Sequence, residues 1–245
     1  MGKNNNSRLL VTLSLFTFGL IGLPLLFTSC GKQGNINPVE AKIEYQVLNL
    51  SYDILPVNLY VDFLKQTTSP VSYPNSSGYI SLNTIDTPFQ IRSANIASVT
   101  NLLVIDSTKL SRRTKYSVFI TGSRENNTLT YIFTVDSSTV PRVGRGKIRF
   151  VNAALPVGGT ERGLDLTAND TVAFSQHTYK KVSDYVELSA GLYNLRIRPS
   201  AKPSETLAEL PRTNIEDGKL YTIYTYGLAG RIDTAAFGAK ILTNR

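Results

Sequence analysis

The sequence predicts an all-β protein, with two tandem antiparallel β-sandwiches that follow an N-terminal export signal. Two observations carry this prediction. Apolar and polar residues alternate with a period of two through most of the chain, as expected of half-buried strands. Several short segments also recur in the same order about a hundred residues later, a spacing that fits two domains better than a solenoid of short repeats.

The alternation is clearest in residues 116–121 and 195–198, where every second side chain is apolar. Strand-favouring Tyr, Thr, Val and Ile are abundant, and turn pairs such as Asp217-Gly218 and Ala190-Gly191 separate the runs. Residues 93–103 are open to a helical interpretation, but their β-branched residues and asparagines weaken it. A hundred residues normally support roughly seven strands in such a sandwich.

The internal repeat consists of four matched segments. The offset is 105 or 106 residues throughout, which indicates a tandem duplication with small differences in loop length. The pairs are 42–45 with 147–150, 78–82 with 184–188, 91–92 with 197–198, and 115–122 with 220–227.

The domain boundary is expected in the Gly- and Pro-containing segment 141–146. Because that segment is short, we expect the two domains to touch and to keep a restricted relative orientation. The predicted organisation is a signal peptide at 1–29, a lipidated cysteine with a polar spacer at 30–40, domain 1 at 41–138, a linker at 139–146, and domain 2 at 147–245.

Cys30 is the only cysteine, and it directly follows an apolar stretch and the small residues Thr28-Ser29. Residues 1–8 carry two basic residues and no acid, so the order is that of a secretory signal. The segment resembles a bacterial lipoprotein signal, in which the cysteine is lipidated and becomes the first residue after cleavage. The alternative is an uncleaved transmembrane helix over residues 9–26, a stretch just long enough to cross a bilayer.

The second half also resembles a protein family. Residues 147–153, 186–199 and 218–224 are similar to successive blocks of the domain-of-unknown-function family 4397, found in exported bacterial proteins. The loop at residues 155–163 departs from the family pattern because it is Gly-rich. The resemblance implies an immunoglobulin-like or transthyretin-like sandwich, and it carries over no established activity and no catalytic residues.

Residues suited to catalysis or to metal binding are sparse. His177 is the only histidine, no nucleophile motif surrounds it, and we expect it in a surface loop. One histidine and one lipidated cysteine make zinc improbable. Acidic loops at 169–170 and 216–217 supply oxygen ligands for calcium without the spacing of a known site. We therefore expect no enzyme, no cofactor and no metal site.

The chain is basic, with 26 Lys plus Arg against 18 Asp plus Glu. The cations gather in three clusters, which we interpret as solvated surface or, alternatively, as attraction to anionic lipid headgroups, lipopolysaccharide or acidic glycans. Nucleic acid is not an expected partner of an exported chain. The clusters are Arg112, Arg113 and Lys115; Arg142, Arg145, Lys147 and Arg149; and Arg196 with Arg198.

Patterned tyrosines are a further candidate surface. Tyr193 and Tyr221 are expected to be half-buried, and in one strand Tyr224 and Tyr226 project together while Tyr221 projects oppositely. Structural packing is the expected role, and a sugar- or peptide-binding face is the functional alternative. A separate hypothesis concerns Thr171 and Thr234, whose Asp-Thr contexts resemble O-glycosylation sites of the Bacteroidota, as does the segment 106–108.

The function expected from these features is that of a non-catalytic cell-envelope lipoprotein. It would be held at a membrane through the lipid on Cys30 and would bind an envelope protein or a glycan. The alternative is an accessory enzyme or carbohydrate-binding lipoprotein of polysaccharide uptake. Residues 31–33 lack the acidic run of some surface-exported Bacteroidota lipoproteins, which slightly favours the periplasmic face of the outer membrane over the cell surface.

Overall fold

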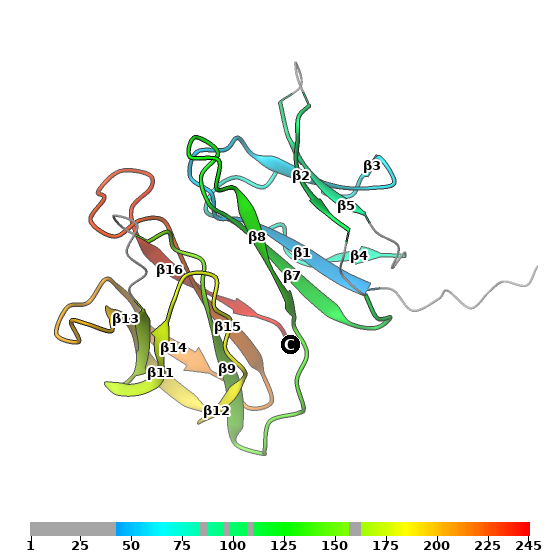
Figure 1. Ribbon diagram of the computed structural model, residues 1–245. Helices are drawn as coiled ribbons and strands as arrows, with labels where there is room; N and C mark the ends of the chain where they lie inside the picture. Colours follow the sequence, from blue (N-terminus) through cyan, green and yellow to red (C-terminus); the bar gives the residue numbers. More distant parts are fainter. Residues whose placement is uncertain (1–42, 84–87, 96–98, 107–109, 157–162) are drawn as a thin grey trace, which may run out of the picture. The chain divides into compact units, whose positions relative to one another are not determined.

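The protein forms two β-sandwiches of eight strands each (Figure 1). The computed structural model describes residues 43–83, 88–95, 99–106, 110–156 and 163–245. Domain 1 holds β1 (Ile43–Asn49), β2 (Val57–Val61), β3 (Leu64–Lys65), β4 (Ile80–Leu82), β5 (Phe89–Ser93), β6 (Asn101–Ile105), β7 (Lys115–Thr121) and β8 (Thr130–Val135). Domain 2 holds β9 (Arg145–Asn152), β10 (Leu164–Ala168), β11 (Thr171–His177), β12 (Val186–Ser189), β13 (Gly191–Pro199), β14 (Ala208–Ile215), β15 (Leu220–Tyr226) and β16 (Gly238–Thr243).

The all-β prediction and the tandem arrangement are confirmed, and the two domains share one topology. Domain 1 has sheets in the order β4-β1-β7-β8 and β3-β2-β5-β6, and domain 2 has β12-β9-β15-β16 and β11-β10-β13-β14. Counted within each domain, both orders are 4-1-7-8 and 3-2-5-6. The internal repeat is therefore a repeat of the complete fold.

The sheets are antiparallel except at one equivalent place in each domain. β1 pairs with β7 in parallel, and β9 pairs with β15 in parallel. A parallel pair requires a long crossover, and here the intervening strands supply it by forming the second sheet. Period-two alternation does not reveal strand direction, which is why the sequence did not indicate this pairing. An immunoglobulin constant domain orders its sheets ABED and CFG, which differs from the order observed in both domains.

The register of the strands corrects the alignment of the first repeat segment. Tyr45 pairs with Tyr116 in domain 1, whereas Ile148 pairs with Tyr221 in domain 2. Tyr45 is thus equivalent to Ile148, an offset of 103 rather than the predicted 105. A slide of two residues preserves which side chains face inward, so the apolar pattern could not distinguish the two alignments.

Each sandwich encloses its own apolar core between its two sheets. Alternate residues of every inner strand contribute, as period-two patterning requires. In domain 1, Tyr45 is fully buried and its ring meets Phe89 edge-on at 5.0 Å. In domain 2, Ile148, Ile197 and Ile223 are fully buried in the corresponding core.

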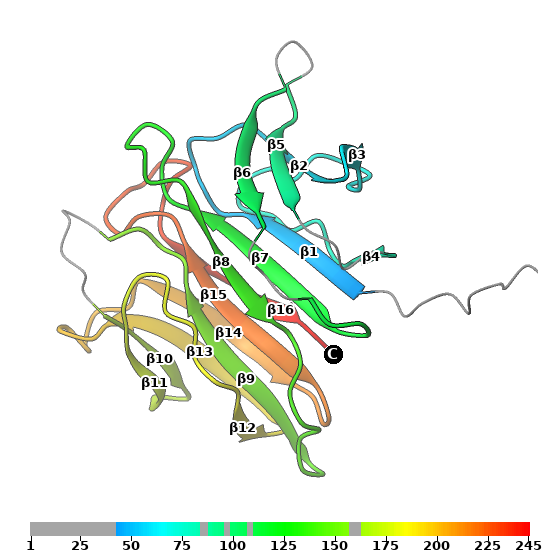
Figure 2. The same cartoon turned by 45° about the vertical axis from the view of Figure 1, so that its right-hand side comes forward.

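A third apolar cluster joins the two domains, which confirms that they touch. It is formed by the outward faces of the sheets β4-β1-β7-β8 and β12-β9-β15-β16 (Figure 2). Phe119 and Tyr224 lie at its centre, with ring centroids 5.7 Å apart. Burial of a large apolar side chain stabilises a fold by about 1.5–3 kcal/mol, so this cluster links the domains firmly. Its buried members are Leu48, Leu50, Phe119, Ile132, Val151, Ala153 and Tyr224.

Corresponding strand ends of the two domains lie on the same side. Asn244, which follows β16, donates from Nδ2 to the Tyr79 hydroxyl at 2.9 Å, and that hydroxyl donates to Asp136, which follows the equivalent strand β8, at 2.7 Å. At the other end of the strands, Thr121 of β7 donates from Oγ1 to the carbonyl of Ala153, which follows β9, at 2.7 Å. We call the side on which β1 and β9 begin the β1 end, and the opposite side the far end. The β1 end faces the lower right in Figure 1.

The segment between the domains is short, and β9 begins at Arg145, inside the predicted linker 139–146. Asp217 accepts from the backbone N–H groups of Gly144 and Arg145 at 2.8 and 3.1 Å. These bonds fix the start of β9 to the β14–β15 turn of domain 2.

Candidate functional site

A pocket of about 380 Å³ opens at the far end of domain 2. Four segments meet there: the residues after β9, the residues after β11, the β13–β14 connection and the β15–β16 connection. The volume lies within the range of about 300–1,000 Å³ that is usual for small-ligand sites.

The pocket lies where the two repeats differ in length. In domain 1 the β1–β2 connection spans residues 50–56, and Ile54 from that connection joins the apolar core. In domain 2 the equivalent connection spans residues 153–163. Of its described residues, Ala154, Leu155 and Pro156 line the pocket, and Ala154 is also buried.

Asn152 holds the base of the pocket in place. Its side chain is buried; Oδ1 accepts from the Ala154 N–H at 3.2 Å and from Thr225 Oγ1 at 2.8 Å, while Nδ2 donates to the His177 carbonyl at 2.8 Å. Asn49 occupies the equivalent place in domain 1, where it binds Ser51 N and the Val71 carbonyl. The repetition shows that this asparagine orders the connection, and its amide is already engaged within the protein.

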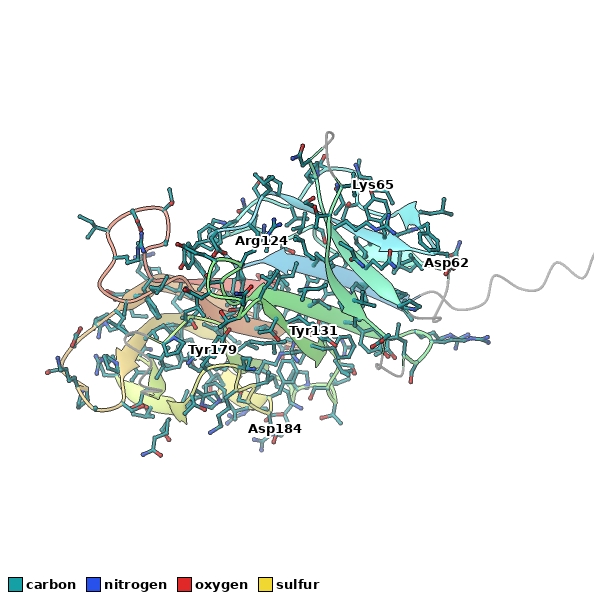
Figure 3. The ribbon with its side chains drawn as sticks, turned by 45° about the horizontal axis from the view of Figure 1, so that its top comes forward. Asp62, Lys65, Arg124, Tyr131, Tyr179 and Asp184 are labelled. Atoms are coloured by element: carbon teal, nitrogen blue, oxygen red, sulfur yellow. The ribbon has the colours of Figure 1, made fainter. Side chains whose placement is uncertain are left out.

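Tyr179 forms a wall of the pocket and connects it to domain 1 (Figure 3). Its hydroxyl lies 3.3 Å from Oγ1 of Thr121. Burial raises the pKa of Tyr179 above its usual value, so the hydroxyl remains neutral and can either donate or accept a hydrogen bond.

Two opposite charges stand at the rim. Lys202 and Glu205 belong to the β13–β14 connection, and their Nζ and Oε2 atoms are 3.6 Å apart. Both side chains are about half exposed or more, so they can exchange this contact for a ligand at little cost. Glu205 is the one carboxylate among the described residues of the lining.

The remaining lining is mostly apolar. A pocket with apolar walls and a few polar groups suits a ligand that has an apolar face and hydrogen-bonding edges, such as a sugar ring or a peptide side chain. The apolar lining residues are Ala154, Leu155, Pro156, Leu164, Pro199, Leu207, Ala229 and Phe237.

Two members of the second predicted cation cluster, Lys147 and Arg149, are buried rather than solvated, and this corrects the sequence interpretation for them. Arg149 is buried in the domain interface, where it forms an ion pair with buried Asp136. Its Nε donates to Thr222 Oγ1 at 2.8 Å and its Nη1 to the Val135 carbonyl at 2.9 Å. Lys147 is also buried, and its Nζ donates to Thr139 Oγ1 at 2.7 Å.

Arg142 of that cluster and both arginines of the third cluster form surface ion pairs. Arg142 binds Glu187 at 2.7 Å. Arg196 and Arg198 share one strand face, as predicted, and both bind Asp170, at 2.6 and 2.9 Å. Of the first cluster, Arg112 and Arg113 are exposed, while Lys115 binds Glu44 at 2.7 Å.

The prediction that His177 is a surface loop residue is wrong. His177 ends β11 and is only 5% exposed, because its ring packs against Phe150 and Phe174 with centroids 5.2 and 5.7 Å away. Burial lowers its pKa below the usual value, and its Nε2 has no hydrogen-bond partner. Since Thr and Ser flank it, sequence alone favoured an exposed loop.

The predicted projection of the tyrosines is confirmed and they pack against other residues, although Tyr221 is buried rather than half-buried. Tyr221 lies in the core of domain 2, whereas Tyr224 and Tyr226 project to the other face, into the domain interface. Tyr193 donates to the Ser189 carbonyl at 2.9 Å. The turn before it contains Gly191 with φ of 151°, a positive value that glycine adopts readily. Of the proposed glycosylation positions, Thr171 and Thr234 are exposed, and residues 107 and 108 lie outside the described part of the chain.

Cys30 and the whole signal segment lie outside the described residues. Within the described ranges, no helix is long and apolar enough to cross a membrane. In the same ranges no group of three or more His, Cys, Asp or Glu side chains is arranged to hold a metal ion.

The class defined by these features is an all-β double sandwich with a binding-sized pocket at one end of its second domain. The family described as Domain of unknown function (DUF4397) matches residues 44–159 and 160–243, so the chain belongs to that family. The break between the two matched segments falls in the undescribed residues 157–162, which places β9 with the first segment. No curated protein matches the chain.

Sequence reasoning did not identify Tyr179, Lys202, Glu205 or Phe237 as residues of one site. They come from three separate connections and share no motif. A usable signal was the longer β9–β10 connection: once the two repeats are aligned, residues 153–163 stand opposite the shorter 50–56.

Proposed function

We propose that the protein is a non-catalytic cell-envelope lipoprotein, anchored through Cys30, whose second domain binds a glycan or a segment of an envelope protein. The observation that carries this proposal is the pocket at the far end. β1 begins at the opposite end, directly after the chain that leads from Cys30. An anchor on that chain would leave the pocket accessible, away from the membrane.

The chemistry of the lining supports binding rather than catalysis. Glycoside hydrolysis normally uses two carboxylates on either side of the bond that breaks, whereas the described lining offers Glu205 alone, beside Lys202. Nucleophilic catalysis needs a base next to the nucleophile. The buried Nε2 of His177 has no hydrogen-bond partner, and the imidazole ring packs against Phe150 and Phe174.

The alternative is an accessory enzyme or carbohydrate-binding lipoprotein of polysaccharide uptake. Phe237 and Tyr179 favour its carbohydrate-binding form, because aromatic rings can pack against the apolar face of a sugar. The outer membrane is the proposed location, and the absence of acidic residues at 31–33 favours its periplasmic face.

Filling the pocket tests the proposal. Ala229→Trp places a large side chain in the lining, whereas Thr234→Trp places the same side chain at an exposed position of the same connection. Each tagged lipoprotein would be captured from crosslinked cells and analysed by quantitative mass spectrometry, and residues 41–245 would be applied to an array of bacterial glycans. We expect one envelope protein or one glycan class to bind the wild type and Thr234→Trp but not Ala229→Trp. Equal binding by all three, or no specific ligand on either assay, would contradict the proposal.

A further inference from the structure

The exposed apolar side chains are concentrated at the β1 end. Eight of the eleven large hydrophobic residues that are exposed in the described ranges lie there, on turns, on the interdomain segment or at adjoining strand ends. The eight are Phe63, Leu64, Val104, Val135, Val140, Val143, Val172 and Leu192. A soluble surface normally scatters such residues singly, so a concentration on one side indicates a surface that something covers.

The β2–β3 turn is the most distinctive part of this end. Asp62 and Phe63 form a two-residue hairpin turn with φ of 48° and 64°. Positive φ is unfavourable for a bulky residue, yet Phe63 is 77% exposed and the following Leu64 is 69% exposed. Phe63 therefore adopts this unfavourable backbone conformation although its side chain contributes little to the core of the domain.

Domain 2 provides an internal comparison. Its equivalent turn, between β10 and β11, has nearly the same φ angles, 48° and 65°, at Asn169 and Asp170. Asn and Asp are the residues that adopt this conformation most readily. The turn itself thus has no need of phenylalanine. The Arg92 guanidinium lies 5.4 Å from the centroid of the Phe63 ring, and most of that side chain remains exposed for contact with another surface.

Exposed cations lie on the hairpin and on a separate turn at the same end. Lys65 is on the hairpin, and Arg112 and Arg113, both exposed, lie on the turn before β7. Asp62 and Lys65 are seen on the hairpin in Figure 3. Exposed apolar residues beside lysine and arginine are the composition that favours the interface of an anionic bilayer.

The chain before β1 ends at this same surface. Twelve residues separate Cys30 from Ile43, and even fully extended they span at most about 45 Å. A lipid on Cys30 would hold the β1 end within that distance of the membrane. At so high an effective concentration, a weak contact suffices to keep the surface docked.

We propose that the β1 end docks on an anionic phospholipid bilayer, with Phe63 and Leu64 entering the interface and Lys65, Arg112 and Arg113 against the headgroups. The orientation in the cell rests on the anchoring at Cys30 proposed above, while the contact itself does not. Docking at this end directs the domain 2 pocket away from the membrane.

The sequence allows a direct test because it contains no tryptophan and a single cysteine. Residues 30–245 would be coupled through the Cys30 thiol to a maleimide lipid in vesicles of phosphatidylglycerol and phosphatidylethanolamine, which reproduces the tether without biological lipidation. Phe63→Trp would report on the β1 end, and Ile232→Trp, a fully exposed residue at the far end, serves as the matched control. Brominated lipids would then measure tryptophan contact with the acyl region.

We expect brominated lipids to quench Phe63→Trp and to leave Ile232→Trp unaffected. Adding Arg112→Glu and Arg113→Glu to Phe63→Trp should lower the ratio of docked to undocked protein by about tenfold or more, as should replacing the anionic lipid with phosphatidylcholine. All these substitutions lie on exposed turns, and circular dichroism would verify the fold. Absence of quenching at position 63, or equal quenching at positions 63 and 232, would overturn the docking proposal. Neither result would bear on whether Cys30 is lipidated in cells.

Discussion

The buried ion pair between the domains provides the strongest test of how the double sandwich is held together. Asp136 has no exposed side-chain surface, and Arg149 has 4%. The Asp136 carboxylate also accepts from Tyr79 at 2.7 Å and from Thr134 at 2.8 Å, and it contacts Ser117. The substitution Asp136→Ala removes the carboxylate and leaves the guanidinium buried without its counter-charge.

The expected loss follows from that burial. Removing one partner of a buried ion pair costs about 3–5 kcal/mol, because the remaining charge cannot be solvated. Replacing both partners with apolar residues is often far less harmful. We therefore expect Asp136→Ala to lower the free energy of unfolding by about 3–5 kcal/mol, and Asp136→Ala with Arg149→Met to lower it less than the single substitution does. Tyr79→Phe, which removes one hydroxyl from the same carboxylate, should cost about 1 kcal/mol.

Urea unfolding of residues 41–245, followed by circular dichroism and by tyrosine fluorescence, measures these differences. The double-mutant cycle isolates the coupling between Asp136 and Arg149. A single variant within about 1 kcal/mol of wild type would refute the reasoning. So would a double variant whose loss equals the sum of the two single losses.

Two further outcomes follow from the same structure. Gly227→Ala should be more destabilising than Gly230→Ala. Both glycines have positive φ, at 74° and 82°, but a Cβ at Gly227 would lie 2.2 Å from the Ala236 carbonyl oxygen, whereas a Cβ at Gly230 would meet open space. We expect Gly230→Ala to lower the free energy of unfolding by about 1–2 kcal/mol and Gly227→Ala to lower it more, and equal losses of stability in thermal melts would contradict the account. Burial lowers the pKa of His177 in the folded state, with smaller opposing contributions from the Ser175 carbonyl and Asp165 and a reinforcing one from Lys181. The unfolded chain therefore binds a proton at this histidine first, so stability should be fully present above pH about 6.5 and should decline as the pH falls below it. His177→Phe should flatten that decline between pH about 6.5 and 5, and an unchanged slope would show that His177 is not its source.

The architecture could be predicted from the sequence because both the apolar periodicity and the internal duplication are visible in the order of the residues. Alternation in segments such as 195–198 predicted the strands, and the repeat predicted two like domains that touch. Strand direction could not be predicted from the sequence, because the Tyr45 side chain faces inward whether β1 pairs with its neighbour in parallel or antiparallel. The two-residue slide between Tyr45 and Ile148 was hidden for the same reason.

The candidate site was less accessible from the sequence than the fold. Arg149 and His177 were expected on the surface because charge and polar neighbours usually indicate exposure, but the partners that bury them are remote in sequence. The pocket depends on how Tyr179, Glu205 and Phe237 meet at one strand end. Such a meeting is a property of topology, which single-sequence patterns do not encode.

The anchoring at Cys30 is the central claim of the functional account, since it decides which end of the protein faces the membrane. Intact-mass analysis of the native protein from the membrane fraction, with Cys30→Ala as the control, tests it most directly. The account predicts a chain that begins at Cys30, lacks residues 1–29 and carries the added mass of a diacylglycerol and acyl group, while the variant lacks that mass and leaves the processed membrane form. A wild-type chain that keeps residues 1–29, or that carries no lipid mass on Cys30, would contradict it.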